Sequence, residues 1–205
     1  MCTPSSPKPA PADRVLCVTN RLLCRNDFTA QIERIAEARP AGIILREKDL
    51  DAPAYRQLAE RLLPICRRAN VPLVIHGHPD IAQELGVQAL HLTAAQLRAN
   101  EDIDIAGCTE ISASCHSVAQ AKRAAACGCT RIIAGHVFAT DCKKDLPPRG
   151  IEFLEGICTC TSLPVWAIGG ITPSRIEEVC AAGAAGGCMM SAFMLADDPA
   201  ALIKR

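Results

Sequence analysis

One histidine has the setting of a proton-transfer group. His136 follows the apolar run RIIAG (131–135) and precedes a polar loop that ends in a double proline, Pro147-Pro148. An imidazole, with an ordinary pKa of about 6.5, can accept and return a proton near neutral pH. The alternative is a structural histidine that hydrogen-bonds a neighbouring backbone carbonyl. The position favours His136 as the acid/base of an active site.

Cationic side chains follow two of the apolar runs. Arg46 and Lys48 come directly after GIIL (42–45), and Lys143-Lys144 lie in the loop after His136. Arginine can hold a phosphate or carboxylate through two parallel hydrogen bonds, whereas lysine acts as a point charge. These residues could therefore bind an anionic substrate. The alternative is that they are solvated or pair with nearby carboxylates, namely Glu47, Asp49 and Asp141.

A glycine pair and a serine suggest a phosphate site. Gly169-Gly170 follows PVWAI (164–168), and Ser191 lies near the end of the next run, GCMMSA (187–192). Glycine lets backbone amides approach a phosphate closely, and a helix that opens at Thr172-Pro173 would add the positive end of its dipole, with Thr172 as the N-cap. The alternative is a tight turn and a simple helix cap.

The remaining histidines also lie in or just after apolar runs. Several imidazoles near one another would suggest zinc, but no spacing here enforces three ligands, so we predict no metal site. One of them alternates with Leu90 and Leu92, which favours a core or structural role. The four residues are His76, His78, His91 and His116.

Parallel strands that alternate with helices would bring all these residues together. Eight short apolar runs recur along the chain, and several stretches between them have helical spacing of apolar residues, for example 27–38, 117–128 and 173–183. The runs cover 15–19, 42–45, 72–76, 89–92, 110–115, 131–136, 164–170 and 187–192.

This alternation predicts an α/β fold, a single (β/α)8 TIM barrel over residues 14–205. Its active site would lie at the carboxyl ends of the strands. A doubly wound open sheet is the alternative, but five or six strands usually suffice for it, and no G-x-G-x-x-G follows the first run. No interior linker is visible, so we expect one domain.

Composition limits the partners. Lysine plus arginine (22) balances aspartate plus glutamate (22), so no overall field favours nucleic acid or an anionic membrane. No apolar run approaches the roughly 20 residues of a membrane span.

Residues 1–13 are rich in proline and serine without an apolar core, which predicts a disordered lead rather than a signal peptide. We expect a cytoplasmic protein whose 13 cysteines are mostly buried thiols in a reducing compartment.

In this order, six motifs resemble those of thiamin phosphate synthases and TenI-type thiazole tautomerases, over about residues 14–195. The resemblance implies the same barrel, with a thiazole phosphate as the small-molecule ligand and a homodimer as one candidate oligomeric state. The motifs are ILREK (44–48), H-x-x-x-D-I-A (76–82), ASCHS (113–117), GHVFATDCKK (135–144), PVWAIGGITP (164–173) and MMSA (189–192).

Residues at a few positions distinguish the two branches. The synthase joins a pyrimidine pyrophosphate to a thiazole phosphate and needs magnesium, held by an Asn-Asp pair and a further Asp. Here His76-Gly77 and Gln96 take those places, and Gly135-His136 replaces the synthase Gly-Pro. Thr140-Asp141-Cys142-Lys143 also lacks one threonine of the synthase Thr-x-Thr-Lys loop.

The tautomerase branch matches His136. That reaction shifts a proton in a carboxythiazole phosphate without metal or cofactor, so the resemblance favours a thiazole tautomerase, an isomerase with His136 as its catalytic acid/base. A synthase with altered metal ligands and a non-catalytic thiazole-phosphate-binding regulator are the alternatives. The resemblance implies that substrate contacts come from Arg46, Lys48, Thr140, Lys143, Gly169, Gly170, Met190 and Ser191.

Overall fold

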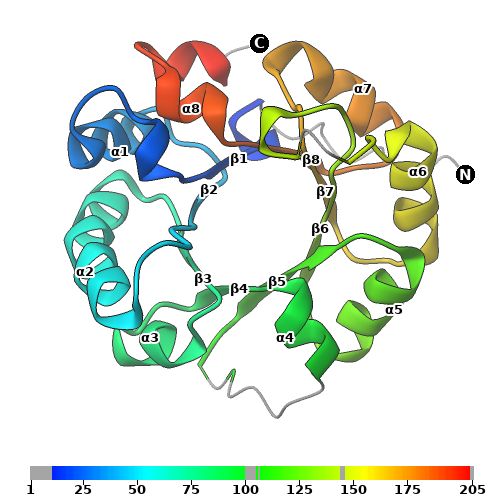
Figure 1. The fold of residues 1–205 in the computed structure, drawn as a ribbon, viewed down its shortest axis with the longest axis horizontal. Helices are drawn as coiled ribbons and strands as arrows, with labels where there is room; N and C mark the ends of the chain where they lie inside the picture. The colour runs from blue at the N-terminus through cyan, green and yellow to red at the C-terminus, as the bar shows by residue number, and fades with distance from the viewer. Residues whose placement is uncertain (1–10, 100–104, 106, 144–145, 204–205) are drawn as a thin grey trace, which may run out of the picture.

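The chain folds into a closed barrel of eight parallel strands with helices on its outside (Figure 1). The structure is a computed structural model that describes residues 11–99, 105, 107–143 and 146–203. Its strands are β1 (Val15–Val18), β2 (Gly42–Leu45), β3 (Leu73–His76), β4 (Ala89–Leu92), β5 (Glu110–Cys115), β6 (Arg131–Gly135), β7 (Val165–Ile168) and β8 (Gly186–Met189). The predicted TIM barrel is therefore confirmed, and all eight predicted runs contain a strand.

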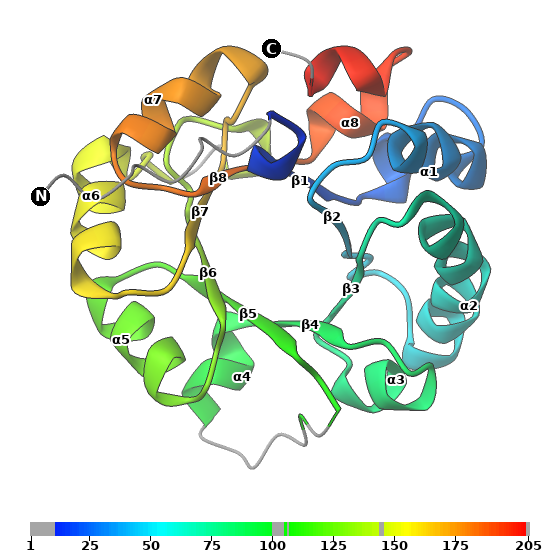
Figure 2. The ribbon, with the colours of Figure 1, turned by 180° about the vertical axis from the view of Figure 1, so that it is seen from behind.

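Helices surround the barrel on all sides, as the view from behind also shows (Figure 2). Short 3-10 helices, η1 to η5, fill several connections: Pro11–Arg14, Arg21–Leu23, Asp141–Lys143, Pro173–Arg175 and Pro199–Leu202. The α-helices are α1 (Phe28–Glu37), α2 (Ala52–Ala69), α3 (Pro79–Glu84), α4 (Ala94–Ala99), α5 (Val118–Ala126), α6 (Gly150–Cys160), α7 (Ile176–Ala181) and α8 (Ser191–Leu195).

Strand alternation divides the core into two layers. Leu16 and Val18 of β1 belong to a cluster inside the barrel, whereas Val15 and Cys17 pack in the layer between the strands and the helices. Because successive side chains of a strand point to opposite faces, both faces must be apolar when both are covered. This explains why the strands read as nearly continuous apolar runs.

Side-chain caps set where several helices begin. The Asp27 carboxylate accepts a hydrogen bond from the Ala30 amide (2.8 Å) at the start of α1, as an N-cap does. Thr172 is at the N-cap position of the 3-10 helix η4, but the capping bond predicted for it is wrong. Its hydroxyl lies 2.9 Å from the Ser174 hydroxyl and caps no backbone amide.

Parts of the sequence predictions lie outside the described residues. These are Lys144 and residues 1–10 of the expected lead, whereas Pro11–Arg14 forms η1 and Ala12 packs against the core. The cysteines whose state the structure gives, from Cys17 to Cys188, are free thiols. Within the described part, no helix has the length and apolar character needed to cross a membrane.

A glycine at the amino end of β8 gives the first prediction. A Cβ on Gly186 would lie 2.2 Å from the Arg14 carbonyl oxygen and 2.8 Å from the Trp166 ring. Gly186→Ala should therefore lower the free energy of unfolding by about 1–3 kcal/mol, measured by urea denaturation. Gly156→Ala in α6 is the control, because nothing lies within 4 Å of its added Cβ, and it should be neutral or slightly stabilising. Equal effects of the two substitutions would contradict this account of the packing.

Candidate active site

A cavity of about 380 Å³ opens at the carboxyl ends of the strands and is lined by all nine predicted site residues. The volume lies in the range of small-molecule sites. Barrel closure explains the convergence, because residues from four different connections meet at one rim. The nine residues are Arg46, Lys48, His136, Thr140, Lys143, Gly169, Gly170, Met190 and Ser191.

Three cations that line the cavity, Arg46, Lys48 and Lys143, form no ion pair among the described residues, and we call them the cation cluster. In the described part of the chain, the ion pairs all involve other cations. Arg46, then burial, then Lys143 lower the pKa of Lys48. Burial, then Arg149, then Arg46 lower the pKa of Lys143. The three charges thus repel one another, and a bound anion would relieve that repulsion.

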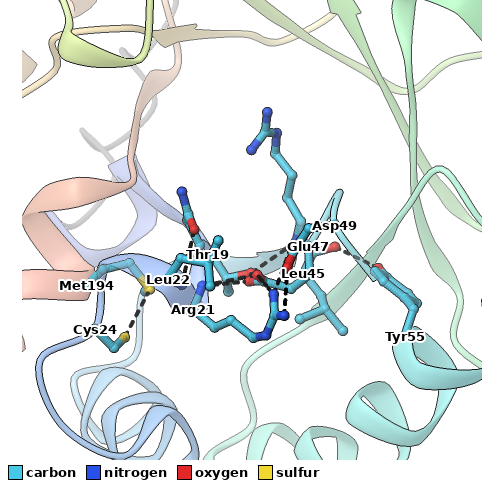
Figure 3. A network of polar contacts seen from close by, with 11 residues as sticks. Thr19, Arg21, Leu22, Cys24, Leu45, Glu47, Asp49, Tyr55 and Met194 are labelled. Carbon is cyan, nitrogen blue, oxygen red and sulfur yellow. Dashed lines mark hydrogen bonds and ion pairs between the residues drawn. The ribbon is translucent and has the colours of Figure 1, made fainter. Parts of the chain in front are cut away.

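A buried carboxylate holds the strand end that carries two of these cations (Figure 3). Glu47 is 3 % exposed and accepts hydrogen bonds from the Thr19 hydroxyl (2.6 Å) and the Arg21 amide (3.0 Å). The Thr19 hydroxyl in turn accepts a hydrogen bond from the Arg46 amide (2.9 Å). Arg21 also pairs with Asp49 (2.6 Å). Glu47 and Asp49 are therefore engaged by Arg21 and leave Arg46 and Lys48 unpaired.

His136 lies with one ring nitrogen bonded and the other free. Its Nε2 lies 3.2 Å from the Leu146 carbonyl oxygen, which can only accept, so Nε2 carries the proton in the neutral ring. Its Nδ1 is buried and has no hydrogen-bond partner among the described residues. Nδ1 is therefore a free acceptor in a residue that lines the cavity.

The turn after β7 packs directly on the His136 loop. A Cβ on Gly169 would lie 2.3 Å from Cβ of His136, and one on Gly170 would lie 2.4 Å from the Ala139 carbonyl oxygen. Both glycines also have positive φ, 98° and 64°, which larger residues rarely adopt. The Phe138 amide donates to the Gly169 carbonyl (3.0 Å). Only glycine fits both positions.

Two further histidines, His76 and His91, stack on each other in the barrel. His91 is buried, and its ring nitrogens each lie 2.8 Å from a serine hydroxyl, Ser112 and Ser114 of β5. His76 stacks on it with ring centroids 5.1 Å apart and lines the cavity. Burial, followed by Arg46 and Lys48, lowers the pKa of His76 to about 4, so its imidazole is neutral at pH 7. The structural role expected of His91 thus fits its contacts.

His116 is a cavity residue that sequence reasoning left without a role. Its Nδ1 lies 2.7 Å from the Gly135 carbonyl, so Nδ1 donates and Nε2 is the acceptor. Ser114 and Thr93 also line the cavity and were missed. The signal for Ser114 was available, since Ser112 and Ser114 alternate with apolar residues in EISASC.

Residues 15–193 match the model of the family TMP-TENI, described as thiamine monophosphate synthase. The chain belongs to this family. It is 36% identical over 202 residues to the thiamine-phosphate synthase of Roseiflexus castenholzii, covering 96% of this chain and 89% of that protein. It is 34% identical over 198 residues to the thiamine-phosphate synthase of Roseiflexus sp., covering 95% and 84%.

A solved structure agrees on the fold. Thiamine phosphate pyrophosphorylase from Pyrococcus furiosus superposes with a TM-score of 0.82 at 24% identity, over 94% of this chain and 93% of that one. At this identity the likeness shows the fold alone.

These relatives overturn the prediction of a thiazole tautomerase. They are named as synthases, which are transferases, so both the tautomerase function and the isomerase class are wrong. The prediction rested on His136 and on the absence of the expected magnesium carboxylates at His76-Gly77 and Gln96. A histidine at a strand end is compatible with more than one reaction on this barrel, because function depends on the whole site.

The buried carboxylate at the cation cluster gives a prediction about stability. Glu47→Gln would place an amide N–H₂ against the donors of Thr19 or Arg21, so it should lower the free energy of unfolding by about 1–3 kcal/mol. Asp49→Asn is the control, because this carboxylate also binds Arg21 but is 44% exposed, and its loss of stability should be clearly smaller. Urea denaturation measures both, and a larger loss for Asp49→Asn would contradict the proposed support.

The neutral His76 predicts a pH dependence. Its folded pKa of about 4 is below the ordinary 6.5, so the unfolded chain binds the proton first as the pH falls. The free energy of unfolding should therefore decrease between about pH 6.5 and 4, with His76 contributing roughly 1–3 kcal/mol. His76→Gln should give a shallower curve over this window in urea denaturation at several pH values. Parallel curves for the two proteins would contradict the low pKa.

Proposed function

We propose that this protein joins a pyrimidine pyrophosphate to a thiazole phosphate and releases pyrophosphate. The observation that carries the proposal is that one cavity is lined by two different sets of groups suited to anions. The cation cluster is one set, and the turn Gly169-Gly170 with Met190 and Ser191 is the other. A reaction between two phosphate-bearing substrates requires two such places, and the named synthases among the relatives support this reaction.

The two sets would bind different groups. The cation cluster provides one guanidinium and two ammonium groups, which suit the more highly charged pyrophosphate. The glycine turn and the hydroxyls of Thr140 and Ser191 provide neutral donors, which suit the single phosphate of the thiazole. This arrangement would hold both substrates with their rings between the two anion sites.

The residues would then act by position and charge. In the proposed step, a thiazole ring nitrogen forms a bond to the pyrimidine methylene carbon, and the carbon–oxygen bond to pyrophosphate breaks. The leaving group gains negative charge, which Arg46, Lys48 and Lys143 would stabilise. Nδ1 of His136 would accept a hydrogen bond from an N–H group of a substrate ring and orient that ring.

A second candidate is a protein that binds the thiazole phosphate without turnover. The specific observation in its favour is that no Asp or Glu is among the described residues that line the cavity, although the resemblance implies carboxylate ligands for magnesium in a synthase. The two candidates differ in whether a product forms.

The assay is incubation of the protein with both substrates, with thiamine phosphate measured by mass spectrometry and released pyrophosphate measured separately. We expect equal amounts of the two products. Lys143→Met should reduce the rate by about tenfold or more, because it removes one charge that faces the leaving group. The exposed Lys122 of α5 supplies the control, and Lys122→Met should retain the wild-type rate. Tight binding of the thiazole phosphate with no product would favour the second candidate instead.

A further inference from the structure

The positions where the resemblance implies magnesium ligands hold groups of the wrong kind. His76 offers an imidazole that stacks on His91, Gly77 has no side chain, and magnesium prefers oxygen ligands in octahedral geometry. Among the described residues, no group of three His, Cys, Asp or Glu side chains could hold a metal ion. This donor set does not fit magnesium.

Gln96, at the remaining position, has both ends of its amide in use. Its Oε1 accepts hydrogen bonds from the amide and the hydroxyl of Thr93, each at 3.0 Å. Its Nε2 donates to the Gly77 carbonyl at 3.0 Å. Gln96 thus ties the connection after β4 to that after β3, and its oxygen would have to give up two bonds to bind a cation.

The carboxylate next to Arg46 and Lys48 in the sequence already has hydrogen-bond partners. Glu47 stands between Arg46 and Lys48, but its side chain is 1 % exposed and binds Thr19 and Arg21. It is absent from the cavity lining, which contains its two cationic neighbours. The described cavity lining therefore contains these cations and no carboxylate, whereas a magnesium ion would need oxygen ligands.

Electrostatics favour an anion over a divalent cation at this place. The positive charges of Arg46 and Lys143 lower the pKa of Lys48, and that of Arg46 also lowers the pKa of Lys143. The three groups therefore repel one another, although they come from the connections after β2 and β6. A magnesium ion beside them would add to the repulsion, whereas a diphosphate would be attracted by all three.

We propose that the cation cluster of Arg46, Lys48 and Lys143 binds a diphosphate group directly, without a divalent metal ion. The inference rests on the proposed function for the role of the diphosphate as leaving group. The binding itself does not depend on turnover. Arg46 can bridge two oxygens with its planar guanidinium, and the two lysines supply point charges.

Isothermal titration of the protein with inorganic pyrophosphate tests this, once in buffer with EDTA and once with magnesium chloride. We expect binding in EDTA, and no tightening when magnesium is added. A requirement for magnesium, or a tenfold or greater tightening by it, would overturn the inference. Absence of pyrophosphate binding under both conditions would overturn it as well.

Substitutions test whether pyrophosphate binds at the cation cluster. Arg46→Met, Lys48→Met and Lys143→Met should each weaken pyrophosphate binding in EDTA by about tenfold or more, since each removes a charge-assisted hydrogen bond to the diphosphate. Lys122→Met carries the same change at an exposed site on α5 and should bind as the wild type does. Equal affinities of all four variants would place the diphosphate elsewhere and contradict the assignment.

The outcomes separate this inference from the proposed function. Metal-independent pyrophosphate binding without thiamine phosphate formation would sustain the cation cluster and contradict the synthase. Thiamine phosphate formation with pyrophosphate binding only in magnesium would sustain the synthase and contradict the inference.

Discussion

Closure of eight parallel strands into a barrel is the constraint on which the site depends. It brings the carboxyl end of every strand to one rim, so residues as distant in the sequence as Arg46 and Ser191 line the same cavity. Alternation along each strand then decides which side chains enter the barrel and which pack under the helices. Just beyond the end of β2, Glu47 is buried beside Thr19 and Arg21, and its two cationic neighbours line the cavity.

Much of the fold could be predicted from the sequence, because apolar runs and helical spacing report local burial. The eight strands followed from runs such as GIIL and ALHL, and the cavity residues followed from reading what comes after each run. Contacts between distant segments could not be read in this way. The bond from His136 to Leu146, the Glu47 network and the hydroxyl pair of Thr172 and Ser174 depend on where the connections pass in space.

The choice between the two branches of the family failed for a related reason. His136 carries a free ring nitrogen in the cavity, which suits a proton acceptor, but the same nitrogen can accept a hydrogen bond from a substrate in a different reaction. Residue type and position at a strand end do not distinguish these uses. The similarity over most of the chain does distinguish them, because the similar proteins are named as synthases. At the positions where the resemblance implies magnesium ligands, this chain has His76, Gly77 and Gln96 in place of carboxylates.

The most direct test is a crystal structure of the protein grown in EDTA with inorganic pyrophosphate and thiazole phosphate. The account predicts pyrophosphate oxygens within hydrogen-bond distance of Arg46, Lys48 and Lys143. It also predicts the thiazole phosphate against Gly170 and Ser191. Pyrophosphate seated in the glycine turn, or bound only when a metal ion is supplied and bridged by it, would contradict the account.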